Sequence, residues 1–425
     1  MGENTHPSVE LRHSAQVRYK LELEQTMTRR NVLAAGVGFA VPSFGAESQP
    51  KSTGRVRHER LPDGGIQPQI AVDDRETMHV LYYSGDARHG NVFYTRSTDS
   101  GVTFSPAMQV NRSGSAIAAG TIRGPQLALG KSGRVHVAWN GSSEAELQGP
   151  VNPDSGKPGS AMLYARLNDA GTAFEPERNL MHRSFGLDGG GSVAADAAGN
   201  VYVTWHGIPL DAKSGGGPEG EARRQVWVAR SDDNGRTFVG EEKAWEQATG
   251  ACGCCGMKVF ASRQGSVHAL YRSATEAVHR DIYLISSKDH GKSFQGGLLH
   301  KWEINACPMS SMDFAENANA IIGAWETGGQ VYWARIGGRP ETMQPIAAPG
   351  KAKGRKHPRV AINKSGEILF VWTEGTGWQR GGSVAWQLYD RSGQPASENG
   401  LAAGIPAWSF AAPAANKDGS FSIVY

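Results

Sequence analysis

The chain has 425 residues, and its 44 Lys and Arg against 41 Asp and Glu leave a formal net charge of only +3. This small balance argues against a dedicated nucleic-acid binder, which we expect to carry a concentrated basic face. Hydrophobic residues make up 39% of the chain, which is enough for a packed core, and no apolar run reaches the roughly 18 residues of a membrane-spanning helix. We therefore expect neither a nucleic-acid partner nor stable membrane insertion. Gly supplies 55 residues, about twice the usual share, which predicts many tight turns and short strands.

Residues 27–46 have the pattern of an export signal. Arg29 and Arg30 precede a short apolar stretch, Val32 to Val41, that runs into small residues. An Arg pair ahead of a modest apolar segment resembles a twin-arginine signal peptide. The stretch is too short to span a bilayer, which argues against a membrane anchor. We therefore predict a periplasmic or secreted bacterial protein.

The rest of the chain divides at this signal. We interpret residues 1–26, which precede the signal, as an upstream segment that follows from a start codon placed too early, with Met27 as the true initiator. Residues 47–425 follow the signal, and we predict that they form a single domain.

The chain repeats one unit seven times. Each unit has an apolar segment that ends in an aromatic residue, at Val80–Tyr83, Val135–Trp139, Val201–Trp205, Val267–Tyr271, Ile321–Trp325, Leu369–Trp372 and Ile423–Tyr425. A first apolar segment and a polar turn precede each of these segments, and a third alternating segment follows most of them. Alternation of period two between Gly and Asp turns indicates β-strands, and four-stranded meanders at this interval are typical of β-propeller blades. The fold class predicted is therefore all-β, with a propeller architecture.

A turn motif with Asp, Gly and Phe at fixed positions follows the third segment of several units. Good copies lie at Ser97–Phe104, Ser231–Phe238 and Ser287–Phe294, and a diverged copy lies at Leu167–Phe174. In such a turn Asp accepts backbone N–H bonds, Gly takes a positive φ, and Phe packs between blades. The motif resembles the Asp box of the sialidase-like β-propellers, and the resemblance covers nearly everything from about Gly64 to the end of the chain. It implies a propeller whose Asp-box turns lie on the face away from the usual ligand site.

The number of blades follows from the strand count. Sialidases of this class have six blades, which is the alternative here, but this sequence has seven pairs of first and second strands. The last pair ends at Tyr425, and the N-terminal segment Val56 to Leu61 can complete its sheet. Pairing of the two chain ends would leave no open sheet edge. We therefore predict seven blades.

Function is expected at one mouth of the central channel. In a propeller, the loops that enter the first strands and those that leave the second strands open on the same mouth. Entry loops supply Arg123, Asp188, residues 252–258, residues 307–312 and His357, and exit loops supply Tyr83, Asn140, His206, Arg272, Glu326 and Glu374.

The family resemblance implies a candidate hydrolytic site. Exo-sialidases of this family bind a sugar carboxylate with three Arg, use a Tyr nucleophile polarised by Glu, and protonate the leaving group with Asp. Arg123, in an Arg-x-Pro element that follows the first Asp box instead of preceding all of them, is similar to the family's first Arg. Arg272 and Arg280 are the next candidates, with Asp281 and Glu326 as candidate carboxylates. The alternative is a set of arginines on the surface or in ion-pair ladders along the strands, with Arg280 and Asp281 as an ion pair. No Tyr has an unambiguous Glu partner.

The four cysteines form a second candidate site. They fall in residues 252–257 and 307–312, which the repeat places on entry loops of adjacent blades. Because export leads out of the cytoplasm, a disulfide from Cys252 or Cys254 to Cys307 is the first interpretation. The alternative is a soft-ligand site for Cu(I), made by the thiolates with a Met. Its candidate ligands are Cys252, Cys254, Cys255, Cys307 and Met309, with Met257 and Met312 as further thioethers. The spacing is not that of a zinc ribbon.

Two functions remain open. The first is an exported glycoside hydrolase of the exo-α-sialidase class that acts on terminal acidic sugars of a glycan or glycoconjugate, with Trp139, Trp205 or Trp325 as stacking faces near the mouth. The second is a non-catalytic propeller that binds a glycan, a protein or a copper ion through the Cys and Met loops. Copper is the one candidate cofactor that the residues indicate. Convergence of three Arg and a Tyr–Glu pair on one pocket would favour the hydrolase.

Overall fold

The computed structural model describes residues 54–425 apart from 213–217, 277 and 352–353. The upstream segment 1–26 and the predicted signal at 27–46 lie outside the described residues.

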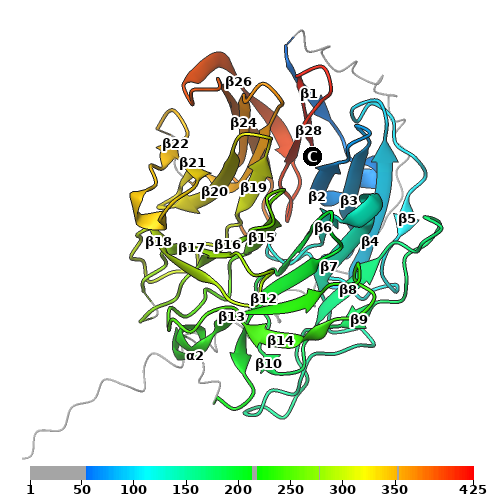
Figure 1. Cartoon of the computed structure of the whole chain (residues 1–425), viewed down its shortest axis with the longest axis vertical. Coiled ribbons are helices and arrows are strands. Elements are labelled where there is room, and N and C mark those ends of the chain that lie inside the picture. Colours follow the sequence, from blue (N-terminus) through cyan, green and yellow to red (C-terminus); the bar gives the residue numbers. More distant parts are fainter. Residues whose placement is uncertain (1–53, 213–217, 277, 352–353) are drawn as a thin grey trace, which may run out of the picture. The chain divides into compact units, whose positions relative to one another are not determined.

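The described chain is almost entirely β-structure (Figure 1). Its helical elements are α2 (Pro218–Arg223) and 3₁₀ turns at Pro62–Gly64, Lys131–Gly133 and Pro340–Thr342. Within this part of the chain, no helix has the length and apolar character needed to cross a membrane.

Six sheets share one plan, in which four antiparallel strands neighbour one another in chain order. Blade 1 contains β2 (Ile66–Val72), β3 (Met78–Gly85), β4 (Gly90–Ser97) and β5 (Met108–Gln109); blade 2 contains β6 (Gln126–Leu129), β7 (Val135–Asn140), β8 (Met162–Arg166) and β9 (Arg178–Asn179); blade 3 contains β11 (Ser192–Ala195), β12 (Val201–Pro209), β13 (Gln225–Ser231) and β14 (Val239–Lys243). Blade 4 contains β15 (Lys258–Ala261), β16 (Val267–Arg272), β17 (Ile282–Ser287) and β18 (Gln295–His300); blade 5 contains β19 (Asp313–Glu316), β20 (Ile321–Thr327), β21 (Gln330–Ile336) and β22 (Ile346–Ala347); blade 6 contains β23 (Lys356–Ile362), β24 (Ile368–Glu374), β25 (Gly382–Tyr389) and β26 (Pro395–Ile405). In blade 3, β10 (Ser184–Phe185) also pairs with the end of β12.

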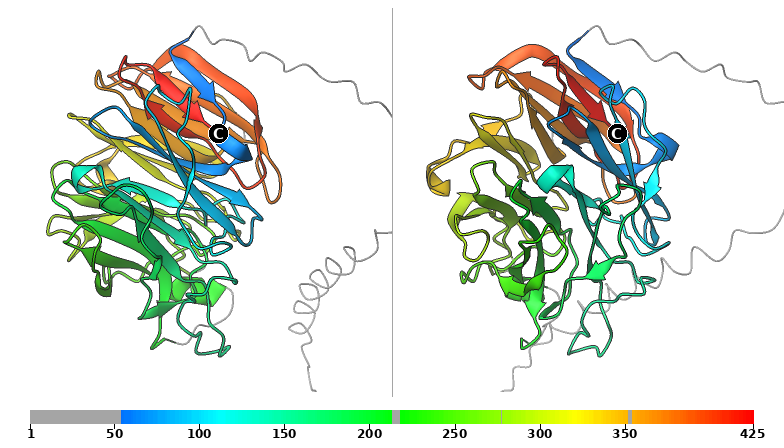
Figure 2. Two further views of the ribbon diagram at one scale, coloured as in Figure 1. Left: turned by 90° about the vertical axis from the view of Figure 1, so that its right-hand side faces the viewer. Right: turned by 45° about the vertical axis from the view of Figure 1, so that its right-hand side comes forward.

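The two chain ends build the seventh blade together. Its strands are β27 (Ala412–Ala415), β28 (Phe421–Val424) and β1 (Val56–Glu59). β1 runs parallel to β28, with Val56 opposite Phe421 and Glu59 opposite Val424. Figure 2 shows these two strands side by side although they lie at opposite ends of the described chain. The predicted pairing of the N-terminal segment with the last strands is confirmed.

The blades close into a ring. The first strands β2, β6, β11, β15, β19, β23 and β27 contact one another in that order, and β27 contacts β2 again. Seven hydrophobic clusters fill the spaces between adjacent blades, one cluster to each pair of neighbours. Because each sheet buries both faces against its neighbours, the core runs round the whole ring. The fold is a seven-bladed β-propeller, as the strand count predicts.

The aromatic residues that end the second strands belong to this core. Trp139, Trp205 and Trp325 are at most 1% exposed. They therefore pack between blades and offer no stacking face to a ligand, which corrects the expectation stated for them above.

The turns of the Asp–Gly–Phe motif are stabilised by the hydrogen bonds that the sequence predicts. In the copy at Ser231–Phe238, Asp233 Oδ1 accepts the backbone N–H of Thr237 at 2.9 Å, and Ser231 Oγ accepts that of Gly235 at 2.9 Å. Gly235 has a φ of 77°, and the ring of Phe238 packs 4.8 Å from that of Tyr164 in the adjacent blade. These turns join third to fourth strands, so antiparallel order places them at the end of the blades opposite the channel mouth.

Candidate functional site

The channel itself is closed below its mouth. A cavity of only about 10 Å³, room for one water at most, is lined by residues from the first strands or entry loops of all seven blades, among them Gln67, Gln126, Gly191, Met257, Met312, Arg359 and Phe410. Just beside it, Asp313 lies between Lys258 at 3.9 Å and Arg359 at 3.5 Å. Burial lowers the pKa of Lys258 to about 8. Along the channel axis, a ligand larger than water therefore has room at the mouth and not in this cavity.

Three consecutive glycines let the loops at the mouth approach closely. A Cβ built on Gly189 would lie 2.1 Å from the carbonyl oxygen of Cys255, and one built on Gly190 would lie 1.7 Å from that of Ile122. Only Gly fits where backbone meets backbone in this way. The entry loops of blades 2, 3 and 4 are therefore held together through the segment 189–191.

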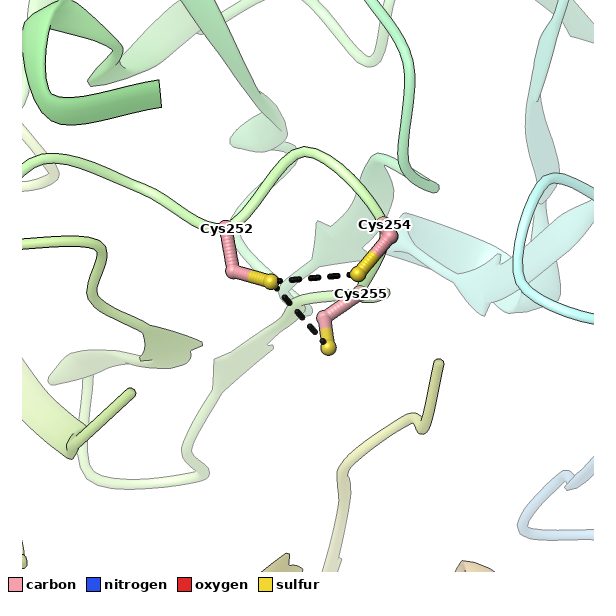
Figure 3. A group of neighbouring side chains, drawn as sticks. All are labelled: Cys252, Cys254 and Cys255. Atoms are coloured by element: carbon pink, nitrogen blue, oxygen red, sulfur yellow. Dashed lines mark hydrogen bonds between the residues drawn. The ribbon is translucent and has the colours of Figure 1, made fainter. Parts of the chain in front are cut away.

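The entry loop of blade 4 carries three thiols that face one another. Cys252 Sγ lies 3.3 Å from Cys254 Sγ and 3.6 Å from Cys255 Sγ, and all three sulfurs lie within 4.8 Å of one another. Figure 3 shows the three side chains on one loop, with dashed lines from the sulfur of Cys252 to those of Cys254 and Cys255. The loop is fastened by backbone bonds from Cys252 to the carbonyl of Arg272 and from Gly256 to the carbonyl of Ser310. The thiols are at most 9% exposed.

The second Cys and Met segment meets this cluster from blade 5. The exposed thiol of Cys307 interacts with that of Cys254, and Met309 packs against the three buried cysteines. All four cysteines are free thiols in the structure, so the bridge predicted between Cys252 or Cys254 and Cys307 is not formed. Met257 and Met312 are buried in inter-blade clusters.

The cluster favours one thiolate among the thiols. Burial alone would raise the pKa of Cys255, but hydrogen bonds from Cys252 and Cys254 and the charge of Arg272 hold it well below its usual value. Hydrogen bonding with Cys252, Cys255 and Cys307 raises the pKa of Cys254. A negative charge at Cys255 is therefore stabilised by two thiol donors and a nearby guanidinium.

Two of the arginines predicted as a sugar clamp are buried in ion pairs. Arg272 and Glu326 are joined at 2.9 Å, with side chains 1% and 2% exposed. Arg280 binds Glu221 of α2 at 2.5 Å, and Arg272 Nη1 donates to the carbonyl of Arg280 at 2.8 Å. The alternative pairing of Arg280 with its neighbour Asp281 is not found, because Asp281 Oδ1 accepts the backbone N–H of Trp302 instead.

Arg123, the third predicted clamp residue, lies nearer the solvent. Its Nη2 meets Asp188 Oδ1 at 2.5 Å, and its Nε donates to the carbonyl of Asp188 at 2.6 Å. The side chains of Arg123 and Asp188 are 19% and 43% exposed. Each predicted arginine thus has its own carboxylate partner in the structure.

No Tyr–Glu pair accompanies them. Among the described residues, no Tyr hydroxyl is hydrogen-bonded to a Glu carboxylate: Tyr83 bonds to backbone carbonyls, and Tyr271 bonds to Thr249 and Trp245. The arrangement expected of the family's nucleophile is therefore not built in this part of the chain.

The mouth also carries an aromatic pair that the sequence analysis missed. Trp378, in the exit loop of blade 6, is 59% exposed, and its ring meets that of Trp408 edge-on at 4.5 Å. A Cβ on Gly120 would lie 2.4 Å from Arg123 Nη1 and 3.7 Å from the ring of Trp378, so the guanidinium and the indole border the same glycine. Trp408 has a φ of 65°, a strained value for a bulky residue.

A sequence signal for Trp378 exists. It stands between Gly377 and Gln379 in a loop that leaves a second strand, outside the repeating aromatic position of the blades. An aromatic residue that does not fit the core pattern is the candidate for the surface. Glu221, the partner of Arg280, has no such signal because it lies in an insertion between β12 and β13.

Solved structures resemble this chain only at low similarity. No family model and no curated protein matches the sequence. A Hadza microbial sialidase aligns at 13% identity and a TM-score of 0.49 over 72% of this chain and 63% of its own, so the chain spans less than two thirds of that protein's length. A Dyadobacter fermentans protein of unknown function aligns at 13% identity and 0.49, over 80% and 94% of the two chains. The α-L-arabinofuranosidase of Fusarium graminearum aligns at 13% identity and 0.47, over 77% and 93%. The seven-bladed fold is established by the sheet topology and by the ring of contacts between first strands.

Proposed function

We propose that this chain is an exported carbohydrate-active propeller that binds a terminal acidic sugar of a glycan at its channel mouth. The observation that carries the proposal is Trp378, an exposed indole that shares its surroundings with the guanidinium of Arg123. A pyranose ring presents a C–H face that packs on an aromatic ring, and a sugar carboxylate pairs with a guanidinium. The two side chains together suit an acidic sugar better than a neutral one.

The charges around the aromatic pair support the same ligand. Arg380 is exposed and lies two residues after Trp378 in the same loop. Asp188 occupies one side of Arg123, and because its carboxylate is 43% exposed it can turn to solvent when a ligand carboxylate arrives. Exchange of one carboxylate for another keeps the guanidinium paired throughout.

Binding of N-acetylneuraminic acid, measured by calorimetry, tests the proposal. We expect Trp378→Ala to weaken binding about tenfold, since stacking on an indole is worth roughly 1.5 kcal/mol. Arg123→Gln should weaken it by about tenfold or more, because it removes a charge-assisted pair. Leu401→Ala and Arg391→Ala, at exposed positions away from the mouth, are the matched controls. Equal binding of galactose, or full affinity in both mouth variants, would refute the proposal.

Hydrolysis of the exo-α-sialidase class is the finer proposal, and the Asp-box resemblance favours it. As a hydrolase, the chain is expected to release the fluorophore from a fluorogenic sialoside, with kcat/KM reduced at least about hundredfold in Arg123→Gln. The buried pairs Arg272–Glu326 and Arg280–Glu221 would have to open for a three-arginine clamp to form. Sugar binding without fluorophore release would leave a glycan-binding propeller and reject the hydrolase.

A further inference from the structure

The thiol cluster at the mouth lies beside the sugar site but does not belong to it. The proposed sugar site uses Trp378 and Arg123, whereas the cysteines lie together on the entry loop of blade 4. We propose that Cys252, Cys254 and Cys255 bind one Cu(I) ion in a three-coordinate site, with Cys307 and Met309 at the entrance to that site.

The spacing of the sulfurs suits a three-coordinate metal. A metal–thiolate bond of about 2.3 Å places the sulfurs of a trigonal site roughly 4 Å apart. In the structure, the sulfur of Cys252 lies 3.3 Å from that of Cys254 and 3.6 Å from that of Cys255, and no pair of the three sulfurs is more than 4.8 Å apart. The three thiols therefore need to move outward by only fractions of an ångström to hold an ion, while the loop backbone stays fastened to blades 4 and 5.

Arg280 provides an independent sign that a negatively charged group belongs here. Its side chain is 5% exposed, and its Nε and Nη1 atoms are buried without a hydrogen-bond partner. It interacts electrostatically with Cys252 and Cys254. Three thiolates around one Cu(I) carry a net charge of −2, and the free N–H groups of Arg280 are placed to stabilise that charge.

The donor set selects a soft ion. Within the described part of the chain, the potential metal ligands gathered at this centre are the three thiols, and Glu221 nearby is engaged by Arg280 and by the N–H of Gly253. The ring of His206 is directed at the carbonyl oxygen of Cys255. Thiolate and thioether ligands favour Cu(I). Structural Zn²⁺ calls for four ligands in tetrahedral positions, usually as spaced pairs from two segments, whereas here three ligands come from four consecutive residues.

Cys307 gives the site its entrance. It is exposed while the other three thiols are buried, and it interacts with Cys254 at the rim of the cluster. An incoming ion can bind Cys307 first and pass to the buried thiols by ligand exchange. Met309, which packs on the cluster with a φ of 49°, lies beside this path.

Anaerobic titration of the reduced full-length chain with Cu(I), in competition with a Cu(I) chelator, tests the inference. We expect one Cu(I) per chain by native mass spectrometry and a thiolate-to-copper charge-transfer band in the ultraviolet. Cys255→Ser and Cys252→Ser should each weaken binding at least about hundredfold, and Cys307→Ser by about tenfold. Met309→Leu should weaken it several-fold, whereas Met343→Leu, at a buried methionine in another cluster, should leave it unchanged.

Several results would overturn the inference. One is an equal Cu(I) affinity of the wild-type chain and Cys255→Ser in the chelator competition. Another is Zn(II) that excess Cu(I) does not displace from the reduced chain. A third is loss of two thiols per chain in metal-loaded protein, because a disulfide would consume the ligands. Circular dichroism melts of each variant check that a lost site is not a lost fold, and sugar binding by the metal-free chain separates this inference from the proposed function.

Discussion

Replacing Glu326 with Ala is expected to lower the free energy of unfolding by about 3–5 kcal/mol. Arg272 and Glu326 are nearly fully buried and 2.9 Å apart, and Glu326 Oε1 also accepts the backbone N–H of Gly329 at 2.7 Å. Alanine would leave the buried Arg272 guanidinium without its carboxylate, although its bonds to backbone carbonyls remain, and the backbone N–H of Gly329 without its acceptor. Urea unfolding, followed by Trp fluorescence, measures the loss.

Two further variants show whether burial causes the effect. Glu341→Ala breaks an ion pair with Arg339 whose side chains are 53% and 83% exposed, and it should change stability by less than about 1 kcal/mol. The double variant Arg272→Met, Glu326→Leu removes both charges and should recover most of the loss. If Glu326→Ala is as stable as wild type, Arg272 has another route to solvent and remains available to a substrate carboxylate.

The propeller could be predicted from the sequence because its causes are local. Period-two alternation, Gly turns and the Asp–Gly–Phe motif act within one blade, and the ring only repeats them. The seventh blade needed one non-local step, the pairing of Val56 with Phe421. That step followed from counting strands, since an unpaired last sheet would expose an edge.

The position of the candidate site could be predicted from the sequence, but the ion pairs of its arginines could not. Strand direction alone places Arg123, Asp188 and the cysteines at the same mouth. Which carboxylate neutralises which arginine depends on contacts between blades, as for Arg272 of blade 4 with Glu326 of blade 5. Glu221 comes from an insertion that no repeat positions, so its bond to Arg280 could not be read from the chain.

The tryptophans show the same limit. The repeat draws attention to Trp139 and Trp205 because they recur at equivalent strand ends, and recurrence of that kind reflects inter-blade packing. Trp378 occurs once, in an irregular loop, and is 59% exposed. Residues that depart from a repeat are therefore the better candidates for function in a propeller.

The two candidate sites meet at residues 188–190. Asp188 holds Arg123 of the proposed sugar site, and Gly189 approaches Cys255 of the thiol cluster so closely that a Cβ would lie 2.1 Å from its carbonyl oxygen. A shift of this segment must therefore move the partner of Arg123 and the loop that carries the thiol cluster together.

Gly189→Ala is accordingly expected to damage both sites at once. The added Cβ would also lie 2.6 Å from His206 Nε2 and 2.9 Å from the carbonyl oxygen of Gly253. Because two of the three clashing atoms belong to backbone, the loop of blade 4 must move, which should cost about 1–3 kcal/mol of stability. Urea unfolding measures that loss, and chelator competition and sugar calorimetry should each show affinity reduced about tenfold.

Gly159→Ala is the matched control for this variant. A Cβ on Gly159 would meet nothing within 4 Å, so stability should change by less than about 0.5 kcal/mol and both affinities should stay at the wild-type level. Loss of Cu(I) affinity in Gly189→Ala with sugar affinity intact would mean that Arg123 keeps its position without the segment 188–190. In that case the thiol cluster and the sugar site would be mechanically independent, and only the ring of blades would join them.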